Sequence, residues 1–303
     1  MRSQQQTLCG APSTPLVTIR EDEVSAHLLA RARVFAGGLA QFLLPPACAI
    51  CRAPHRPDVD GIVCGTCLAR LVPLTLPQCH RCGHPRLSAN APLPLHEDGQ
   101  ISPLPPCRWC ARLPPIVRAA RSVCRMDIGT GAALVHALKY GGWPAVARPM
   151  ARRMARLQFP DDVIRERTLL VPMPLADTRR RERGYNQAEQ IATALSPLWQ
   201  LPVMRTGLHR IRNTRSQVQL TPSERTRNVS CAFAVHAGSR AILRGAHIVL
   251  VDDVITTAAT LNAAAHALAD GGARIISYVT FGRAPDPGDR TDSTFDSDRN
   301  THA

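Results

Sequence analysis

The second half of the chain alternates short apolar runs with stretches in which apolar residues recur at helical spacing. Runs of strand type cover residues 120–126, 168–173, 247–254 and 274–281, with shorter candidates at 201–204 and 231–235. Helical patterns cover residues 130–139, 144–157, 186–198 and 256–273. Strands that alternate with helices in this way predict an α/β fold, an open parallel sheet with flanking helices.

The remaining segments have different patterns. Residues 25–44 have apolar positions compatible with one amphipathic helix, although Gly37 and Gly38 interrupt it. Proline and cysteine are dense up to residue 117, and a polar, Pro-, Asp- and Ser-rich tail predicts disorder. We therefore predict an N-terminal extension, a metal-binding module, an α/β domain and a tail, over residues 1–44, 45–117, 118–283 and 284–303.

Composition narrows the class of protein. A chain of 303 residues suggests about two domains, and 45% hydrophobic with 20% charged residues is typical of a globular protein. No apolar, uncharged stretch is long enough to predict a membrane span. The net charge is +14, and only one of the 37 basic residues is a lysine, Lys139. The arginine excess reflects either codon bias on solvated faces or attraction to polyphosphate or nucleic acid.

Eight of the eleven cysteines fall into four Cys-x-x-Cys pairs. The pairs are Cys48/Cys51, Cys64/Cys67, Cys79/Cys82 and Cys107/Cys110. Two intervening residues let both thiolates bind one tetrahedral metal, so four pairs predict two closed, structural zinc sites. A secreted disulfide framework or a thioredoxin-like redox pair is the competing interpretation, but the N-terminus has no signal-peptide pattern and the pairs lie in a Pro-rich stretch. We expect a cytoplasmic protein; the spacing leaves open how the pairs combine.

A strand that ends in two acids is the most informative segment. The apolar run that starts at His247 delivers Asp252 and Asp253 at its end, and a loop rich in threonine then opens a helix. Ligands of open parallel sheets bind beyond the carboxyl ends of the strands, and a helix N-terminus binds anions. A phosphate site beside two carboxylates suits a ligand that also carries sugar hydroxyls or Mg²⁺.

This segment, HIVLVDDVITTAATL, resembles the loop of type I phosphoribosyltransferases that binds phosphoribosyl pyrophosphate (PRPP). The cysteine pairs and the segments LKYGG (138–142), LVPMPL (170–175), RRRERGYNQAEQIA (179–192) and RNTRSQVQLTPSERTRNVSCAF (212–233) extend the resemblance over roughly residues 45–282. Together they resemble the ComF family of competence-associated phosphoribosyltransferase-like proteins, which includes the GntX type.

The resemblance implies a type I phosphoribosyltransferase-like fold that binds PRPP with Mg²⁺. Asp252 and Asp253 would hold the ribose hydroxyls. The 5-phosphate would bind to the loop residues Thr256, Thr257, Ala258, Ala259 and Thr260. The family pattern usually has glycine at position 258, and alanine disfavours a positive φ, so we expect weaker phosphate binding.

Other segments supply candidates for a pyrophosphate loop or a lid. They are Lys139, Pro172, Met173, Pro174, Arg183, Gly184, Asn186, Gln187 and, in a predicted hood over residues 210–228, Arg225. Arginine offers paired N–H donors to phosphate oxygens. An ordinary strand end, a solvated arginine run and a solvated loop are the competing interpretations.

Three functions stay open at this point. The first is a phosphoribosyltransferase (a glycosyltransferase) for a nitrogenous acceptor that the sequence does not identify. The second is a PRPP- or nucleotide-binding regulator without turnover, which Ala258 favours. The third is an accessory protein that binds single-stranded DNA through its basic face and zinc module. The family is linked to DNA uptake and transformation, which implies competence or recombination proteins as partners.

Overall fold

The computed structural model describes residues 46–55, 61–86, 107–211 and 232–285. The chain divides into two compact units, residues 1–46 and 47–303, and every described residue after Pro46 belongs to the second. The helix predicted over residues 25–44, nearly all of the tail and most of the predicted hood lie outside the described residues. Among those that are described, no helix is both long and apolar enough to cross a membrane.

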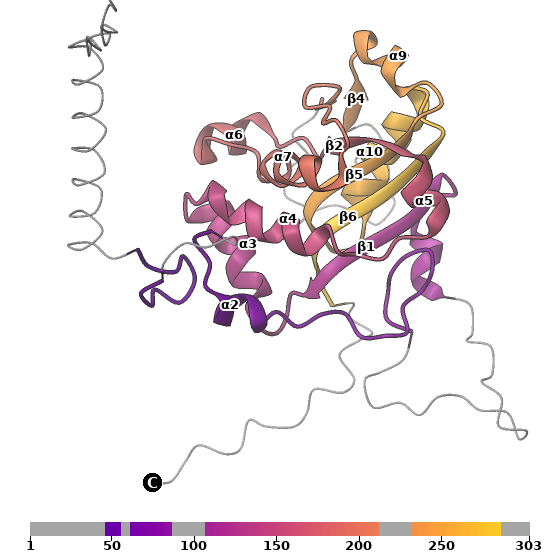
Figure 1. Ribbon diagram of the computed structural model, residues 1–303. Coiled ribbons are helices and arrows are strands. Elements are labelled where there is room, and N and C mark those ends of the chain that lie inside the picture. The colour runs from indigo at the N-terminus through magenta and orange to yellow at the C-terminus, as the bar shows by residue number, and fades with distance from the viewer. Residues whose placement is uncertain (1–45, 56–60, 87–106, 212–231, 286–303) are drawn as a thin grey trace, which may run out of the picture. The chain divides into compact units, whose positions relative to one another are not determined.

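Four parallel strands form the central sheet, in the order β1-β6-β5-β2 (Figure 1). They are β1 (Val117–Arg125), β2 (Arg167–Pro172), β5 (His247–Ile255) and β6 (Ile275–Arg283). Each corresponds to one of the four long strand-type runs, and the predicted open parallel sheet is confirmed. After His247, the first half of β5 is continuously apolar because the sheet is covered on both faces.

Helices pack on both faces of this sheet (Figure 1). Successive residues of a strand point to opposite faces, and β5 shows this directly: Val249 and Val251 join one buried cluster, Ile248 and Leu250 the other. The first cluster includes α3 (Gly131–Tyr140), α4 (Ala147–Met154) and α7 (Gln187–Trp199). The second includes α10 (Ala259–Asp270).

Several short elements complete the described chain. They are α2 (Gly65–Ala69), η1 (Arg108–Arg112), η2 (Pro144–Val146), α5 (Asp161–Glu166), α6 (Asp177–Arg183), β3 (Leu208–Arg210), β4 (Phe233–Val235), η4 (Ala237–Ser239) and α9 (Arg240–Leu243). β3 and β4 pair as an antiparallel ribbon. The short strand predicted at 201–204 is reduced to one bridge between Val203 and Leu170. The pattern did not predict α6, because this helix buries none of its residues.

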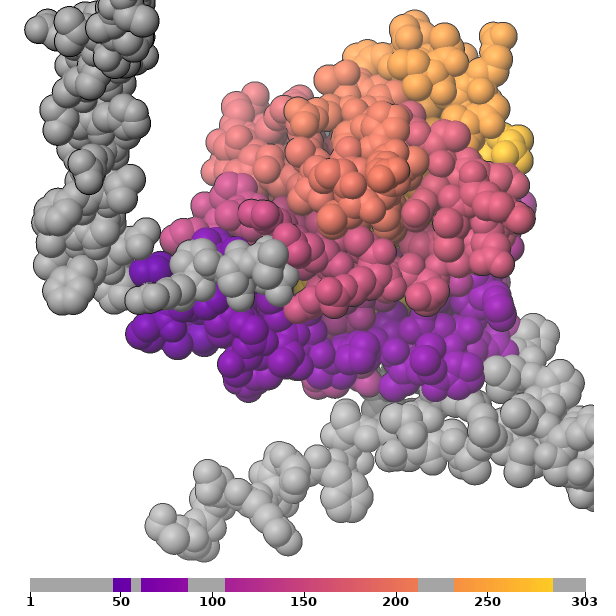
Figure 2. All heavy atoms as spheres, viewed as in Figure 1, coloured from indigo at the N-terminus to yellow at the C-terminus, as the bar shows by residue number. Residues whose placement is uncertain are grey.

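The cysteine-rich segments pack against the α/β body and share its two buried clusters. Cys48 and Cys67 belong to the cluster under α3 and α4, whereas Cys82 and Trp109 belong to the cluster under α10. Figure 2 shows these segments, in indigo and violet, along one side of the body. Each group of cysteines therefore extends the core on a different face of the sheet.

Candidate functional site

The four cysteine pairs assemble into two clusters in chain order. The first cluster is Cys48, Cys51, Cys64 and Cys67, and the second is Cys79, Cys82, Cys107 and Cys110. Within each cluster the four sulfur atoms lie within 4.8 Å of one another. The first pair of the sequence thus combines with the second and the third with the fourth, the point that spacing alone left open.

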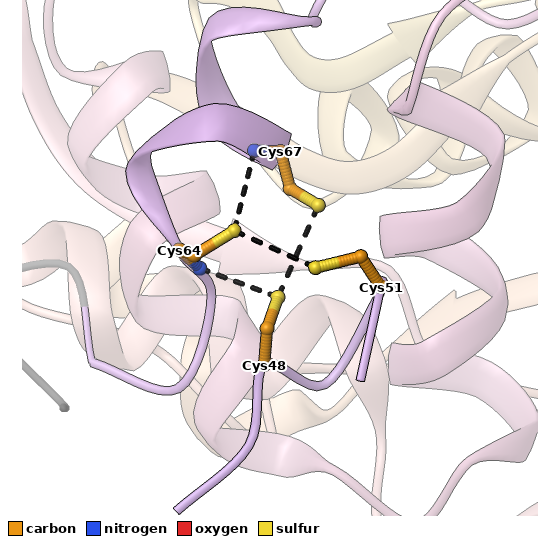
Figure 3. A group of neighbouring side chains, drawn as sticks. All are labelled: Cys48, Cys51, Cys64 and Cys67. Carbon is orange, nitrogen blue, oxygen red and sulfur yellow. Dashed lines mark hydrogen bonds between the residues drawn. The ribbon is translucent and has the colours of Figure 1, made fainter. Parts of the chain in front are cut away.

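The sulfur positions fit a tetrahedral zinc ion. A Zn–S bond of about 2.3 Å places the sulfur atoms of a tetrahedron about 3.8 Å apart. The Sγ–Sγ distances are 3.9 Å for Cys48–Cys67 and 3.7 Å for Cys51–Cys64. In the second cluster they are 3.4 Å for Cys79–Cys110 and 3.5 Å for Cys82–Cys107. Figure 3 shows the sulfur atoms of the first cluster turned toward a common centre. Four cysteines supply all the ligands of a tetrahedral ion, so each cluster fits a structural zinc site.

The protonation of the thiols points to the same need for a cation. Burial opposes ionisation of Cys48, but the backbone N–H groups of Cys64, Cys51 and Ile50 outweigh it and lower its pKa to about 6. Burial and the neighbouring thiols raise the pKa of Cys67. The thiolate of Cys48 thus forms readily, whereas the thiol of Cys67 resists ionisation. A bound metal ion supplies the charge that lets all four ionise.

Two buried arginines, Arg121 and Arg283, and the half-buried Arg81 connect the second cluster to the sheet. Arg81 donates hydrogen bonds to the carbonyls of Val117 and Pro114, at 3.1 Å and 2.8 Å. Arg121 donates to the carbonyl of His80 at 2.8 Å, and Arg283 donates to that of Cys82 at 2.6 Å. Sequence reasoning missed this role, because arginines with carbonyl partners distant in sequence look the same as arginines on a solvated surface.

A cleft of about 1060 Å³ lies where β2 and β5 end. Twelve of the predicted site residues line it: Lys139, Met173, Pro174, Arg183, Asn186, Gln187, Asp252, Asp253, Thr256, Ala258, Ala259 and Thr260. Three others are not among the lining residues, namely Pro172, Gly184 and Thr257. Pro172 is paired within β2, and Gly184 ends α6 with a φ of 76°. Arg225 lies outside the described residues. The structure thus brings most of the predicted set together at the carboxyl ends of the strands.

The acid pair is held tightly in the wall of this cleft. The backbone N–H of Asp253 donates to Asp252 Oδ1 at 2.9 Å, and Lys139 Nζ lies 2.9 Å from Asp253 Oδ2. Burial and the neighbouring Asp253 carboxylate raise the pKa of Asp252 to about 7, against the opposing effects of the Asp253 N–H and Lys139. Carboxyl oxygens of the pair can accept hydrogen bonds from sugar hydroxyls.

The expected Mg²⁺ fits this acid pair poorly. Carboxylate oxygens are the protein ligands that Mg²⁺ prefers. However, Asp253 already has an ammonium group as its partner, and its side chain is only 8% exposed. The pair is therefore not a free two-carboxylate site for a divalent cation.

The loop predicted to bind phosphate leads directly into α10. Ala258 has φ 65° and ψ 1°, the left-handed conformation that favours glycine, and it is almost fully buried. For a residue with a Cβ atom this conformation costs about 1–2 kcal/mol. The departure noted in the sequence therefore falls on the one loop position that takes a positive φ. The first N–H groups of the helix lack intrahelical partners and carry its positive dipole end, so they can bind an anion.

The opposite wall comes from the start of α7 and the loop after β2. The Asn186 side chain caps α7 by accepting from the N–H of Ala188 at 3.1 Å, and its Nδ2 donates to the carbonyl of Met173 at 2.9 Å. The neighbouring Gln187 is 3% exposed, and its Nε2 has no partner among the described residues. A buried unsatisfied donor costs about 1–3 kcal/mol, so a ligand oxygen there would gain binding energy.

Sequence reasoning missed two tyrosines at this site. Tyr185 Oη donates to the carbonyl of Leu138 at 2.6 Å, which ties α3 to the start of α7. Tyr140 lines the cleft beneath Arg183, whose guanidinium carbon is 4.8 Å from the ring centroid. Both tyrosines lie within the LKYGG and RGYNQ segments, which was the signal that could have identified them.

Comparison with known proteins identifies the family. A family model described as phosphoribosyl transferase domain matches residues 135–300, more than half of the chain. The chain belongs to this phosphoribosyl transferase family. A second model, described as double zinc ribbon domain, matches residues 39–111.

Named relatives of this phosphoribosyl transferase family member fall into two groups. The DNA utilization protein YhgH of Salmonella typhimurium is 29% identical over 243 residues, which cover 77% of this chain and 95% of that protein. Competence protein F of Haemophilus influenzae is 33% identical over 134 residues, or 44% of this chain and 55% of that protein. Competence protein ComFC of Bacillus subtilis is 35% identical over 117 residues, or 38% and 45%. The resemblance to ComF-type proteins with a zinc module is thus confirmed.

Proposed function

We propose that this protein binds PRPP in the cleft and supports the uptake or use of DNA by the cell, in a reducing, cytoplasmic compartment. The observation that carries the proposal is the acid pair of β5 beside the open N-terminus of α10. The names of the relatives, which refer to competence and to DNA utilization, support the cellular role. Competence or recombination proteins would then be its partners.

The ligand would lie along the cleft from α10 to α7. Its 5-phosphate would accept hydrogen bonds from the N–H groups that follow Ala258, where the helix dipole favours an anion. The ribose hydroxyls would contact Asp252 and Asp253. Its pyrophosphate would lie toward Arg183 and the unpartnered amide of Gln187, which line the opposite wall.

Calorimetry with PRPP tests this placement. We expect the parent protein to bind and Asp253→Asn to lose about tenfold or more in affinity, because a hydrogen bond to a charged group contributes roughly 1.5–3 kcal/mol. Asp270→Asn is the matched control, since Asp270 is exposed at the far end of the same helix. No binding by the parent, or equal binding by Asp253→Asn, would reject the proposal.

Turnover is a separate question with its own assay. A transfer reaction would break the bond between the anomeric carbon of ribose and the pyrophosphate, and the acceptor atom would take its place. Release of pyrophosphate with a panel of nitrogenous bases would identify a transferase. Binding of PRPP without release would identify a regulator, which the left-handed Ala258 favours.

Binding of single-stranded DNA is a second candidate, favoured by helix α6. This helix buries none of its residues, and it carries Arg179, Arg180, Arg181 and Arg183. Two of these, Arg179 and Arg183, also line the cleft. Solvated arginines beside a phosphate site suit a nucleic acid backbone.

The salt dependence of DNA affinity tests this second candidate. Each arginine contact with a phosphate of a single strand contributes about −0.7 to the slope of log K against log salt concentration. We therefore expect Arg180→Ala with Arg181→Ala to make the slope shallower by about 1.4. Arg165→Ala, on α5, is the control and should leave it unchanged. A flat salt response of the parent would exclude the candidate.

A further inference from the structure

The basic side chain that contacts the acid pair is a lysine, Lys139, in a protein whose other basic residues are arginines. It is the one lysine in the sequence, and its Nζ lies 2.9 Å from Asp253 Oδ2. The Lys139 side chain is 25% exposed and that of Asp253 is 8% exposed. A partly buried pair of this kind is screened by salt much less than a surface pair. The ammonium group is therefore part of the cleft wall.

The helix that carries Lys139 is fastened at both ends. At its start, Thr130 Oγ1 donates to the carbonyl of Cys67 at 2.6 Å, which ties α3 to the first cysteine cluster. Near its end, the carbonyl of the fully buried Leu138 accepts the hydrogen bond from Tyr185 Oη. Lys139 lies in the last turn, where the helix dipole favours a cation. A fixed helix thus delivers the ammonium to Asp253.

Two adjacent carboxylates beside a phosphate site are typical of a site for a divalent cation. Here the ammonium already holds an oxygen of Asp253, and a divalent ion on the same carboxylate would meet a like charge at short range. We propose that Lys139 is the built-in cation of this cleft and takes the place at Asp253 that a divalent ion would take. The site therefore binds the ribose phosphate part of its ligand without a divalent ion on the acid pair. The identity of the ligand in this inference rests on the proposed PRPP binding. The charge argument rests only on the contact between Lys139 and Asp253.

Binding of Mn²⁺ to the zinc-loaded protein without ligand tests the charge argument directly. Mn²⁺ binding is measured by electron paramagnetic resonance, and the parent should bind the ion weakly at this site. Lys139→Met should bind Mn²⁺ at least about tenfold more tightly, because the acid pair has lost the neighbouring ammonium group. Lys139→Arg keeps the charge and should resemble the parent. Adding Asp253→Asn to Lys139→Met should abolish the gain. Equal Mn²⁺ affinity in parent and Lys139→Met, or a gain that survives Asp253→Asn, would overturn the proposal.

Ribose 5-phosphate supplies the second arm, in buffer freed of divalent cations by a chelating resin. The parent should bind this sugar phosphate equally with and without added Mg²⁺, whereas Lys139→Met should need Mg²⁺. A parent that binds only with Mg²⁺ would overturn the inference about Lys139. A parent that binds under neither condition would reject the proposed function, and the Mn²⁺ comparison would still decide the inference. Melting temperatures of all variants show whether each one is folded.

Discussion

The cysteine clusters and the cleft both concentrate negative charge, but they neutralise it in different ways. Each cluster places four sulfur ligands within 4.8 Å of one another, a set that needs a metal ion from outside the chain. The cleft places two carboxylates side by side and supplies its own cation, Lys139, from α3. Two acids in a cleft therefore do not by themselves indicate a metal, because a basic side chain placed by the fold can neutralise their charge.

One helix, α3, joins the first cysteine cluster to the cleft. α3 starts at the first cysteine cluster, through the bond from Thr130 to the carbonyl of Cys67, and ends at the acid pair, through Lys139. α3 therefore contacts both the first cysteine cluster and the acid pair.

Loss of the metal should affect stability most. Cys82 is fully buried under α10, and Arg283 donates to its carbonyl. We expect Cys82→Ser to lower the free energy of unfolding by roughly 3 kcal/mol or more, because binding of structural zinc contributes folding energy. Cys51 is exposed, so Cys51→Ser should cost less. Denaturant unfolding and zinc analysis measure both effects.

The buried Cys124 provides the control for these variants. It belongs to neither cluster, and burial raises the pKa of its thiol to about 12. Cys124→Ala should keep the zinc content of the parent. Full stability of Cys82→Ser, or loss of zinc from Cys124→Ala, would contradict the assignment of the clusters.

The pH dependence of stability should report on the acid pair next. The pKa of Asp252 is raised from 3.8 to about 7, so between these values the folded protein holds a proton that the unfolded chain releases. The free energy of unfolding therefore falls as pH rises through this window, and the loss is complete above about pH 7. Asp252→Asn should flatten the profile and be more stable than the parent in mild alkali, by on the order of 2 kcal/mol.

Melting temperatures across the pH range test this expectation. Asparagine can still accept from the N–H of Asp253, so the variant keeps that hydrogen bond. Asp270→Asn should leave the parent profile unchanged. An identical profile in Asp252→Asn and the parent would contradict the raised pKa of Asp252.

The smallest effect should come from Ala258→Gly. Glycine relieves the left-handed conformation but makes the unfolded chain more flexible, so we expect a gain of about 0.5 kcal/mol in the free energy of unfolding. The same change inside α10, Ala267→Gly, should cost about 1 kcal/mol. Phosphate ligands should also bind more tightly to Ala258→Gly. Equal destabilisation by the two glycines would contradict the strain at position 258.

The sequence predicted those features of the fold and the site whose pattern lies within one continuous segment. The apolar run of β5 and its two acids predicted a strand that ends at a ligand site, and the cysteine spacing predicted two four-cysteine groups. Helix α6 was missed because no apolar face distinguishes it from a solvated loop. The contact between Lys139 and Asp253 could not be predicted, because it joins segments that only the folded sheet and α3 bring together.

A crystal structure of the protein with PRPP tests the central claim most directly. We expect the 5-phosphate against the N–H groups that follow Ala258 and the ribose hydroxyls against Asp252 and Asp253. Lys139 should remain beside Asp253, with no metal ion between the acid pair and the ribose. PRPP bound elsewhere, or a metal ion that displaces Lys139 from Asp253, would contradict the account.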